Sequence, residues 1–543
     1  MKIVVAEKIA APAVELLKQH HDWIVITPEQ IGRELAGQLK DADALIVRSA
    51  VNVDQALLAH ARKLRVIGRA GVGVDNVDLE AATKQGIAVM NTPGANAVAV
   101  AEQTIGMMIA LARHLPRADR LMHEGKWEKK SLQGTELRGK ILGILGLGRI
   151  GMEVARRALA FAMEVVAHDP YVAPDVAEDL GIKVLSLEEV FAAADYLTLH
   201  LGLTPETERM INAGSLPKLK PGVRLVNCAR GELIDEAALA EALRSGHVAG
   251  AALDVFQTEP LKNSPLAEFD NVILTPHIGG STQEAQDAVG VQIAQQVAEY
   301  LAKGIFQNAV NVPSVSYEEY LAMRPYLALA ERLGAFVAQV AEGNVREIVL
   351  RYSGQIATWK TDLVRNAAVM GVLNRVLAEH ANLVNAAAIA ESRGIRVTEP
   401  GRTRKEGGSA PDVLSVRIKA ASGKESNVRG TVLHGKSPRL LSVNEIDVEA
   451  RLEPDLIYMR NQDVPGVIGH VGTTLAKNGV NIADFSLGRA EEGPHPREAV
   501  AVVRVDGPVA DKVIQELRSI TAVKEAKAIH IPTGEKVSAV EGE

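Results

Sequence analysis

Three side chains that could do acid–base chemistry, Arg230, Glu259 and His277, each follow a short apolar run typical of a buried strand. Arginine can hold a carboxylate with two hydrogen bonds, histidine can take a proton from a hydroxyl, and a carboxylate can fix the tautomer of that histidine. Together these residue types predict the oxidation of a 2-hydroxy acid, with all three as catalytic residues. The segments that carry them are VNCARG (226–231), DVFQTEP (254–260) and LTPHIGGST (274–282).

Each of these residues also has a plain structural explanation. An arginine at a strand end is commonly a surface charge, a glutamate before proline is commonly a turn residue, and a histidine before two glycines is often a loop cap. Their common position, downstream of a nucleotide-binding pattern and after strands, favours the chemical interpretation, because ligands of doubly wound sheets bind at the carboxyl ends of the strands.

That nucleotide-binding pattern is the segment ILGILGLGRIGMEVARRALAFAMEVVAHD (141–169), which predicts a strand, a helix and a second strand. Gly146 would permit a tight turn, Gly148 would let a pyrophosphate approach the backbone, and Gly151 would let helix and strand pack closely. Asp169, 23 positions after Gly146, could accept hydrogen bonds from both ribose hydroxyls. Its charge would repel a 2′-phosphate, so the pattern predicts NAD as the cofactor and disfavours NADP.

The bulk composition excludes several classes of protein. The chain has 543 residues, only 3% aromatic, and a net charge of −7 without a block of like charges, so we expect neither a nucleic-acid nor a membrane partner. The N-terminal apolar run is too short for a signal peptide, and no stretch reaches the roughly 18 apolar residues of a membrane span. A single cysteine, Cys228, excludes an internal disulfide and fits a cytoplasmic location. We predict no metal site.

Alternating strand and helix patterns predict an α/β fold in which the cofactor domain begins inside the chain. We expect a doubly wound, Rossmann-type cofactor domain over 98–281, inserted in a flavodoxin-like substrate domain formed by 1–97 and 282–306. A linker is expected around 304–316 and a mixed α+β domain over 317–453. A compact unit over 454–531 and a solvated tail over 532–543 complete the chain. A cationic cluster at Arg402, Arg404 and Lys405 is interpreted as part of a solvated loop.

GLGRIG, VNCARG, LDVFQTEP and TPHIGGST, in this order and spacing, resemble the D-isomer-specific 2-hydroxyacid dehydrogenase family. Within it, segments 69–96 and 125–151 are similar to the members that act on 3-phosphoglycerate, and the resemblance covers about residues 1–310. It implies that Arg230 binds the substrate carboxylate, His277 is the acid/base and Glu259 is its partner. It also implies cofactor contacts at Arg149, Ile150, Asp169, Cys228, Ala229, Arg230, Asp254, His277, Gly279 and Gly280. Cys228 would be a packing or backbone contact and not a nucleophile.

A phosphorylated substrate needs cations away from Arg230. The candidates are Arg48, Ser49, Arg69, Gly71, Gly73, Lys129 and Lys130, although the charged ones could be ordinary surface cations. The resemblance implies that the segment with the two lysines and Trp127 reaches across a dimer interface.

The C-terminal segment 458–490 predicts a strand, a D-x-P-G turn, a helix and a second strand, and it resembles the ACT domain, a βαββαβ module that binds amino acids at paired interfaces. Residues 317–453 resemble the intervening domain of the long family members. Asp463, at a helix start, and Asn481, from a neighbouring copy, are the candidate contacts for an effector, L-serine. A dimerisation module without ligand is the alternative.

The predicted reaction is the NAD-dependent oxidation of 3-phosphoglycerate to 3-phosphohydroxypyruvate, which the resemblance makes the entry step of serine synthesis, carried out by a homo-oligomer (dimer or tetramer). Another 2-hydroxyacid dehydrogenase, acting on glyoxylate or 2-oxoglutarate, is one alternative, and Arg48 with Arg69 argue against it. A redox-sensing corepressor on the same fold is the other, and the ACT-like segment argues against that.

Overall fold

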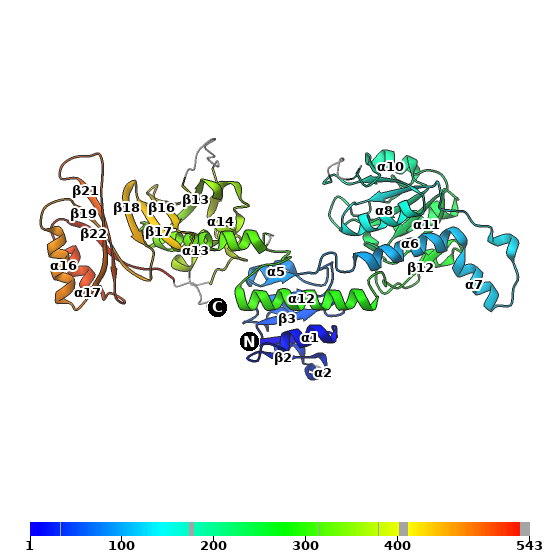
Figure 1. Ribbon diagram of the computed structural model, residues 1–543, viewed down its shortest axis with the longest axis horizontal. Helices are drawn as coiled ribbons and strands as arrows, with labels where there is room; N and C mark the ends of the chain where they lie inside the picture. Colours follow the sequence, from blue (N-terminus) through cyan, green and yellow to red (C-terminus); the bar gives the residue numbers. More distant parts are fainter. Residues whose placement is uncertain are drawn as a thin grey trace. The chain divides into compact units, whose positions relative to one another are not determined.

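The computed structural model describes residues 1–532 with the exception of 33, 173–176, 178, 314, 316, 378–379 and 401–410 (Figure 1). The cationic cluster at Arg402, Arg404 and Lys405 and all but the first residue of the predicted tail therefore lie outside the described residues. The chain divides into two compact units. One contains Met1–Lys8, Val14–Asn91 and the chain from Ile293 onward, and the other contains Ile9–Ala13 and Thr92–Gln292.

The first sheet of the chain is parallel and has the strand order β2-β1-β3-β4-β5, which is the flavodoxin-like order. Its strands are almost wholly apolar because parallel strands are covered on both faces. Gly68 in β4 lies under the long helix α12: a Cβ atom there would be 2.8 Å from side-chain atoms of Ile293 and Val297. The elements are β1 (Lys2–Val5), α1 (Ala11–Lys18), β2 (Ile24–Ile26), α2 (Pro28–Ile31), α3 (Leu35–Leu39), β3 (Ala44–Val47), α4 (Gln55–Leu58), β4 (Val66–Arg69), α5 (Leu79–Lys84), β5 (Ala88–Met90) and α12 (Gln283–Lys303).

The segment that follows α12 is not a free linker along its whole predicted length. Val310 donates a backbone hydrogen bond to Val89 O (2.8 Å), and the Asn311 side chain accepts one from Val89 N (2.8 Å) and donates one to Ile87 O (2.8 Å). An edge strand leaves backbone groups unpaired, and this segment satisfies those of β5. Residues 308–311 therefore belong to the edge of the first sheet.

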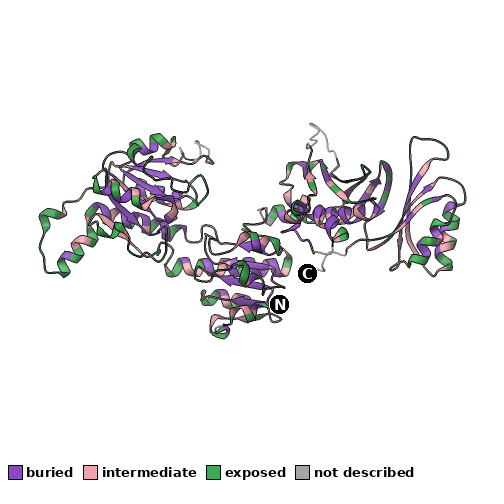
Figure 2. Ribbon diagram, turned by 180° about the vertical axis from the view of Figure 1, so that it is seen from behind, coloured by how far each residue is buried: buried purple, intermediate pink, exposed green. Residues whose placement is uncertain are grey.

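The second unit is built on a seven-stranded parallel sheet of order β12-β11-β10-β9-β6-β7-β8. The order reverses between β6 and β9, which is the position where dinucleotides bind in such folds. Helices α6 and α8 cover one face and α10 and α11 the other, each over an aliphatic core, and the strands are buried between them (Figure 2). The elements are α6 (Ala97–Arg113), α7 (Leu115–His123), η1 (Lys129–Leu132), β6 (Ile141–Leu145), α8 (Arg149–Ala160), β7 (Glu164–His168), β8 (Ile182–Val184), α10 (Leu187–Ala193), β9 (Tyr196–Leu199), η2 (Leu216–Lys218), β10 (Val223–Asn227), η3 (Gly231–Leu233), α11 (Glu236–Arg244), β11 (Val248–Leu253), η4 (Pro265–Glu268) and β12 (Val272–Leu274).

A mixed six-stranded sheet of order β14-β13-β15-β16-β17-β18 and a pair of packed helices follow. Helices α13 and α14 approach through glycines: a Cβ atom on Gly334 would lie 2.2 Å from Ala368 O, and one on Gly371 would lie 2.1 Å from Glu331 O. The elements are α13 (Tyr317–Val340), β13 (Val345–Ser353), η5 (Gln355–Thr358), α14 (Asp362–Val376), α15 (Ala386–Ser392), β14 (Arg396–Thr398), β15 (Val413–Ala420), β16 (Glu425–Leu433), β17 (Ser437–Val443) and β18 (Ile446–Arg451).

The last module is a four-stranded antiparallel sheet of order β20-β21-β19-β22 with two helices, in the predicted βαββαβ order. Both helices supply side chains to its core cluster. The elements are β19 (Asp455–Gln462), α16 (Val467–Lys477), β20 (Ile482–Arg489), β21 (Glu498–Val505), α17 (Asp511–Arg518) and β22 (Val523–His530). The predicted fold class, two parallel α/β modules followed by a mixed α+β domain and a βαββαβ module, is thus confirmed.

Candidate active site

The three predicted catalytic residues follow neighbouring strands of the second sheet. Arg230 comes three residues after β10, Glu259 six residues after β11 and His277 three residues after β12. These strands are parallel and adjacent, so their carboxyl ends share one edge of the sheet. The sheet therefore brings together residues that are up to 47 positions apart in the sequence.

Glu259 and His277 form a hydrogen-bonded pair, with 2.7 Å between Glu259 Oε2 and His277 Nδ1. The other carboxylate oxygen accepts a hydrogen bond from the backbone N–H of Phe256 (3.1 Å), which fixes the carboxylate. A carboxylate at Nδ1 keeps the proton on that nitrogen and leaves Nε2 able to accept a proton. Because 52% of the histidine side chain is exposed, a substrate can reach the ring.

The loop that carries His277 is anchored by Asp254, which is 1% exposed. Its Oδ1 accepts hydrogen bonds from Ile278 N (2.9 Å) and the Thr275 hydroxyl, and its Oδ2 accepts one from Gly279 N (2.7 Å). His277 itself has φ 53°, a left-handed conformation that is uncommon for residues other than glycine and that clusters at functional sites. In this structure Asp254 shapes the loop that carries His277. The predicted contact of Asp254 with the cofactor stays a prediction.

Arg230 belongs to a loop that Asn227 holds in place. The Asn227 side chain, buried at the end of β10, donates to Arg230 O (2.8 Å) and accepts from Ala229 N (3.0 Å), and its backbone carbonyl accepts from Asp254 N (2.9 Å). The backbone of Gly231 rests on Phe256: a Cβ atom on Gly231 would lie 1.9 Å from the Phe256 carbonyl carbon. The Arg230 loop and the Glu259 loop are thus packed against each other. Asn227 was not among the predicted site residues. The signal that could have indicated it is a polar residue at the end of the apolar run that forms β10.

The glycine turn after β6 has the geometry that its sequence predicts. Gly146 has φ 91°, and a Cβ atom there would lie 2.5 Å from His200 O. A Cβ atom on Gly151 would lie 2.2 Å from Gly146 O, so only glycine permits this approach of α8 to the turn. A Cβ atom on Gly148 would meet no atom within 4 Å, which leaves an open approach to the N-terminus of α8, where backbone N–H groups attract phosphates.

Asp169 lies one residue beyond β7, beside this turn. Its Oδ2 accepts a hydrogen bond from Leu147 N (2.8 Å) and its Oδ1 accepts one from Tyr171 N (2.8 Å). These bonds fix the carboxylate while its remaining lone pairs stay available. The residues present therefore fit a dinucleotide, with the ribose at Asp169 and the pyrophosphate at the N-terminus of α8.

Arg149 and Ile150 open α8. The Arg149 guanidinium donates to Pro93 O, which belongs to the loop before α6. Ile150 is partly buried against the core beneath the helix. Gly280 lies close to Asn96, whose Nδ2 would be 3.1 Å from a Cβ atom on Gly280. The loop that follows His277 thus lies close to the start of α6, and Arg149 links the start of α8 to the loop before α6.

Two titratable groups near this edge, the buried Cys228 and the partly buried His200, are uncharged at neutral pH. Burial raises the pKa of the Cys228 thiol to about 12, and its sulfur lies 3.5 Å from the Met107 sulfur, so Cys228 packs in the core. Its predicted cofactor contact stays a prediction. Burial lowers the pKa of His200 to about 4, so this histidine is neutral at the pH values at which enzymes are usually assayed.

The predicted substrate residues of the first unit follow β3 and β4, whose carboxyl ends are adjacent. Arg48 is half-buried and donates to Lys8 O (3.3 Å), whereas Ser49 is exposed. The Arg69 guanidinium folds over Gly71, where a Cβ atom would lie 1.5 Å from Nη1. Gly73, half-buried, follows two residues later.

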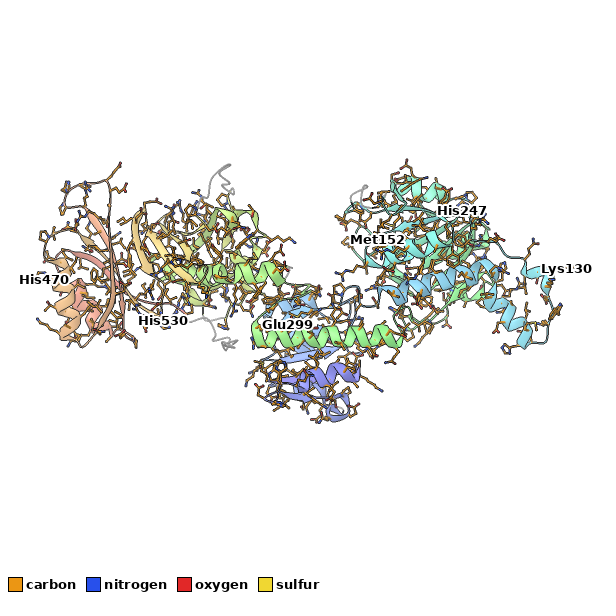
Figure 3. The ribbon with its side chains drawn as sticks, in the orientation of Figure 1. Lys130, Met152, His247, Glu299, His470 and His530 are labelled. Carbon is orange, nitrogen blue, oxygen red and sulfur yellow. The ribbon has the colours of Figure 1, made fainter. Side chains whose placement is uncertain are left out.

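Lys129 and Lys130 are exposed on the segment after α7, on which Figure 3 labels Lys130. Trp127, on the same segment, is 80% exposed, which is unusual for so large an apolar ring. Helix α7 and this segment extend away from the sheet of their unit (Figure 1).

The ACT module contains a cavity of about 380 Å³ between its sheet and α16. Asp463 lies in its wall and forms an ion pair with Arg489 (2.6 Å between Oδ2 and Nε). The other predicted effector residue, Asn481, is exposed, is not part of this wall, and donates to Asp506 of its own chain (2.7 Å). The wall consists of Met459, Asn461, Asp463, Val464, Pro465, Gly466, Val467, Ile468, Val471, Phe485, Leu487, Arg489 and Ala501.

Within the described ranges, no three histidine, cysteine or acidic side chains gather as they would around a metal ion. Among those same residues, no helix combines the length and the apolar character that crossing a bilayer requires.

Three domain families match consecutive parts of the chain. Residues 105–279 match the NAD-binding domain of D-isomer specific 2-hydroxyacid dehydrogenases, residues 322–444 the D-3-phosphoglycerate dehydrogenase intervening domain, and residues 456–522 the ACT domain. The doubly wound fold, its glycine turn and the first match define an NAD-dependent oxidoreductase. The predicted cofactor, NAD, is thereby confirmed.

Relatives that match almost the whole chain share one name. The D-3-phosphoglycerate dehydrogenases of Methanocaldococcus jannaschii and Archaeoglobus fulgidus are 41% and 39% identical to it, and that of Bacillus subtilis is 38% identical. Each match covers 98% of this chain and 100% of the relative. The chain therefore belongs to the D-3-phosphoglycerate dehydrogenase family.

Solved structures match a little over half of the chain. The TT0316 protein of Thermus thermophilus is 37% identical, with a TM-score of 0.52, and the match covers 57% of this chain and 100% of that one. The D-lactate dehydrogenase of Aquifex aeolicus, solved with NAD and lactic acid, is 28% identical with a TM-score of 0.52, covering 58% of this chain and 100% of that one.

Proposed function

We propose that the protein oxidises D-3-phosphoglycerate at C2 to 3-phosphohydroxypyruvate, the first step of L-serine synthesis, with NAD as hydride acceptor. The observation that carries this proposal is the Glu259–His277 pair beside the Arg230 loop, at the edge of the sheet where the glycine turn lies. The full-length likeness to enzymes named D-3-phosphoglycerate dehydrogenase supports the choice of substrate.

The proposed roles follow from the chemistry of each side chain. Arg230 holds the substrate carboxylate through two hydrogen bonds and polarises the carbonyl that forms at C2. His277 Nε2 accepts the proton of the C2 hydroxyl, and Glu259 favours the resulting imidazolium. Bound NAD supplies the acceptor for the hydride that leaves C2. One hydride and one proton thus leave the substrate, and its alcohol becomes a ketone.

The substrate phosphate requires cations that a lactate- or glycolate-oxidising enzyme does not need. We assign phosphate binding to groups that follow β3 and β4, with Arg48 and Arg69 as the cations and Ser49, Gly71 and Gly73 as sources of a hydroxyl and backbone N–H groups. Their support is their charge and position at one sheet edge, together with the adjacency of β3 and β4. Lys129 and Lys130 are further candidate cations.

The test is the initial rate of NADH formation with D-3-phosphoglycerate, compared with D-lactate, glycolate and D-2-hydroxyglutarate at equal concentration. We expect kcat/KM for 3-phosphoglycerate to be highest, and Arg48→Ala to lower it much more than it lowers kcat/KM for D-lactate. Equal loss for both substrates would contradict the phosphate assignment. A higher kcat/KM for an unphosphorylated acid would contradict the proposed substrate.

We propose L-serine as a regulator that binds the ACT module. The cavity beside α16, with Asp463 and Arg489 at its wall, offers a carboxylate for an ammonium and a guanidinium for a carboxylate. Asn481 would come from a neighbouring copy. Because Asp463 is already paired with Arg489, serine must compete with that pair or share it.

A homo-oligomer, either a dimer or a tetramer, is part of the same proposal. The exposed Trp127 on the segment after α7 and the exposed Ile468 and Leu487 at the ACT cavity support it, since such apolar groups are commonly covered in assemblies. Light scattering at several concentrations tests this assignment. A cytoplasmic location remains a prediction that cell fractionation would test.

A further inference from the structure

Glu7 lies two residues beyond β1, at the same edge of the first sheet as the proposed substrate residues. Strand β1 pairs in parallel with β3, so the carboxyl end of β1 is next to that of β3, after which Arg48 and Ser49 follow. Neither the glycine turn nor the catalytic set involves this glutamate.

The Glu7 carboxylate is enclosed by backbone N–H groups of the loop formed by residues 48–51. Its Oε2 accepts hydrogen bonds from Arg48 N (2.7 Å) and Val51 N (3.2 Å), and its Oε1 accepts one from Ala50 N (3.0 Å). Successive backbone N–H groups that converge in this way form a concave anion-binding site. Here the anion is a side chain of the protein itself.

The carbonyl groups of the same loop are held from another element. The Asn76 side chain donates to Arg48 O (2.8 Å) and to Val51 O (2.7 Å). Glu7 therefore binds the donors of the loop, Asn76 binds its acceptors, and the backbone that carries Arg48 and Ser49 is fixed by groups more than 20 residues away on both sides.

We infer that Glu7 is a positioning residue of the substrate site, which acts by ordering the 48–51 loop and thereby the side chains of Arg48 and Ser49. This inference rests on the proposed function of those two residues. The charge of Glu7 has a second effect. Because the Glu7 carboxylate occupies the backbone N–H groups of Arg48, Ala50 and Val51, these N–H groups cannot bind the substrate phosphate. The phosphate must then be bound by other groups, among them the Arg48 guanidinium.

The effect on catalysis should be confined to substrate binding. A loop that must order itself before Arg48 can bind weakens substrate affinity, while the Glu259–His277 pair and the glycine turn lie on a different sheet. Glu7→Gln keeps the size of the side chain, removes the charge and turns one acceptor into a donor that faces backbone N–H groups. Glu7→Asp keeps the charge with a shorter reach.

The experiment measures kcat and both KM values for wild type, Glu7→Gln, Glu7→Asp and a control, Asp43→Asn. Asp43 accepts a backbone hydrogen bond from Lys2 N (2.7 Å) at the opposite end of β1 and β3, so the control removes a similar interaction away from the substrate edge. For Glu7→Gln we expect KM for 3-phosphoglycerate to rise about tenfold or more, with kcat and the KM for NAD within about twofold of wild type. Glu7→Asp should fall between Glu7→Gln and wild type.

Three results would overturn the inference: an unchanged substrate KM in Glu7→Gln, an equal rise in Asp43→Asn, or a fall in kcat with a matching rise in the KM for NAD. The second and third would mark a merely structural role. If Glu7→Gln does not fold, the same comparison is made with Glu7→Asp. Wild-type enzyme without activity on 3-phosphoglycerate would overturn the proposed function and this inference together, whereas an active wild type with an unaffected Glu7→Gln would overturn the inference alone.

Discussion

Glu259 Oε2 lies 2.7 Å from His277 Nδ1, although the two residues are 18 positions apart and follow different strands. The carboxylate is held by Phe256 N, and the histidine backbone by Asp254, so both partners are placed by the ends of β11 and β12. The pair thus depends on the register of two parallel strands.

Glu259→Gln should lower kcat and move the acidic limb of the pH–rate profile to lower pH. The reason is that oxidation requires a neutral imidazole, and a neighbouring negative charge favours the protonated ring. Initial rates from about pH 5 to pH 10 would measure the shift. Because desolvation lowers the pKa of His200 to about 4, His200 stays largely neutral across that range and does not produce the limb. An unchanged profile would mean that Glu259 does not serve His277.

His277→Ala should lower kcat by about 10² to 10⁴ while the protein stays folded, since general base catalysis contributes a factor of that size. His277→Asn is the better matched variant, because asparagine tolerates the left-handed backbone found at this position. Circular dichroism checks the fold, and exposed His60 supplies a His→Ala control. If either His277 variant retained full kcat, the base would have to be another group.

Asp169→Ala should weaken NAD binding by about 1.5–3 kcal/mol, because a charge-assisted hydrogen bond to ribose is lost. The preference for NAD over NADP should shrink at the same time. Asp169→Asn separates charge from geometry, as an amide can still accept one of the bonds from Leu147 N and Tyr171 N. Calorimetric titration with both dinucleotides would measure this. An unchanged NAD/NADP preference in Asp169→Ala would refute the ribose assignment.

Iodoacetamide should leave the native enzyme fully active at pH 8. With its pKa raised to about 12 by burial, the Cys228 thiol is almost entirely protonated there and also inaccessible. Mass spectrometry of the treated protein should find no adduct, whereas urea-unfolded protein should take up one equivalent at this single cysteine. Rapid inactivation of the folded enzyme would show that the thiol is accessible and ionised.

Asp463→Ala should abolish any response to L-serine and leave dehydrogenase activity in its absence unchanged. The variant removes the carboxylate from the cavity wall and frees Arg489. A coupling of about 1–3 kcal/mol between effector and active site is typical, so inhibition of wild type should be several-fold or more. Activity and calorimetric heat at millimolar serine would be measured on both proteins. If wild type shows neither heat nor inhibition, the ACT module serves assembly alone.

Several features could be predicted from the sequence alone because they depend on local patterns. The segment 141–169 predicts a strand, a helix and a second strand, and β6 (Ile141–Leu145), α8 (Arg149–Ala160) and β7 (Glu164–His168) lie there. The G-x-G-x-x-G spacing determined the tight turn, since φ 91° at Gly146 and the close contact of Gly151 with Gly146 O are properties of neighbouring residues. Asp169 also needed no tertiary information, because it ends the strand that follows the glycine helix.

Other features arose only when distant segments met. The sequence pattern does not distinguish Asp254 from any other acidic residue that follows a strand. Only the fold buries it and brings three hydrogen-bond donors of the His277 loop to its carboxylate. Glu7 carries no motif, and its hydrogen bonds join residues more than 40 positions apart because β1 and β3 are neighbours in the sheet. Likewise, Asp463 pairs with Arg489 across the ACT module, which the sequence did not indicate. Spacing along a chain constrains only nearby groups, whereas sheet order and burial decide which distant polar groups must satisfy one another.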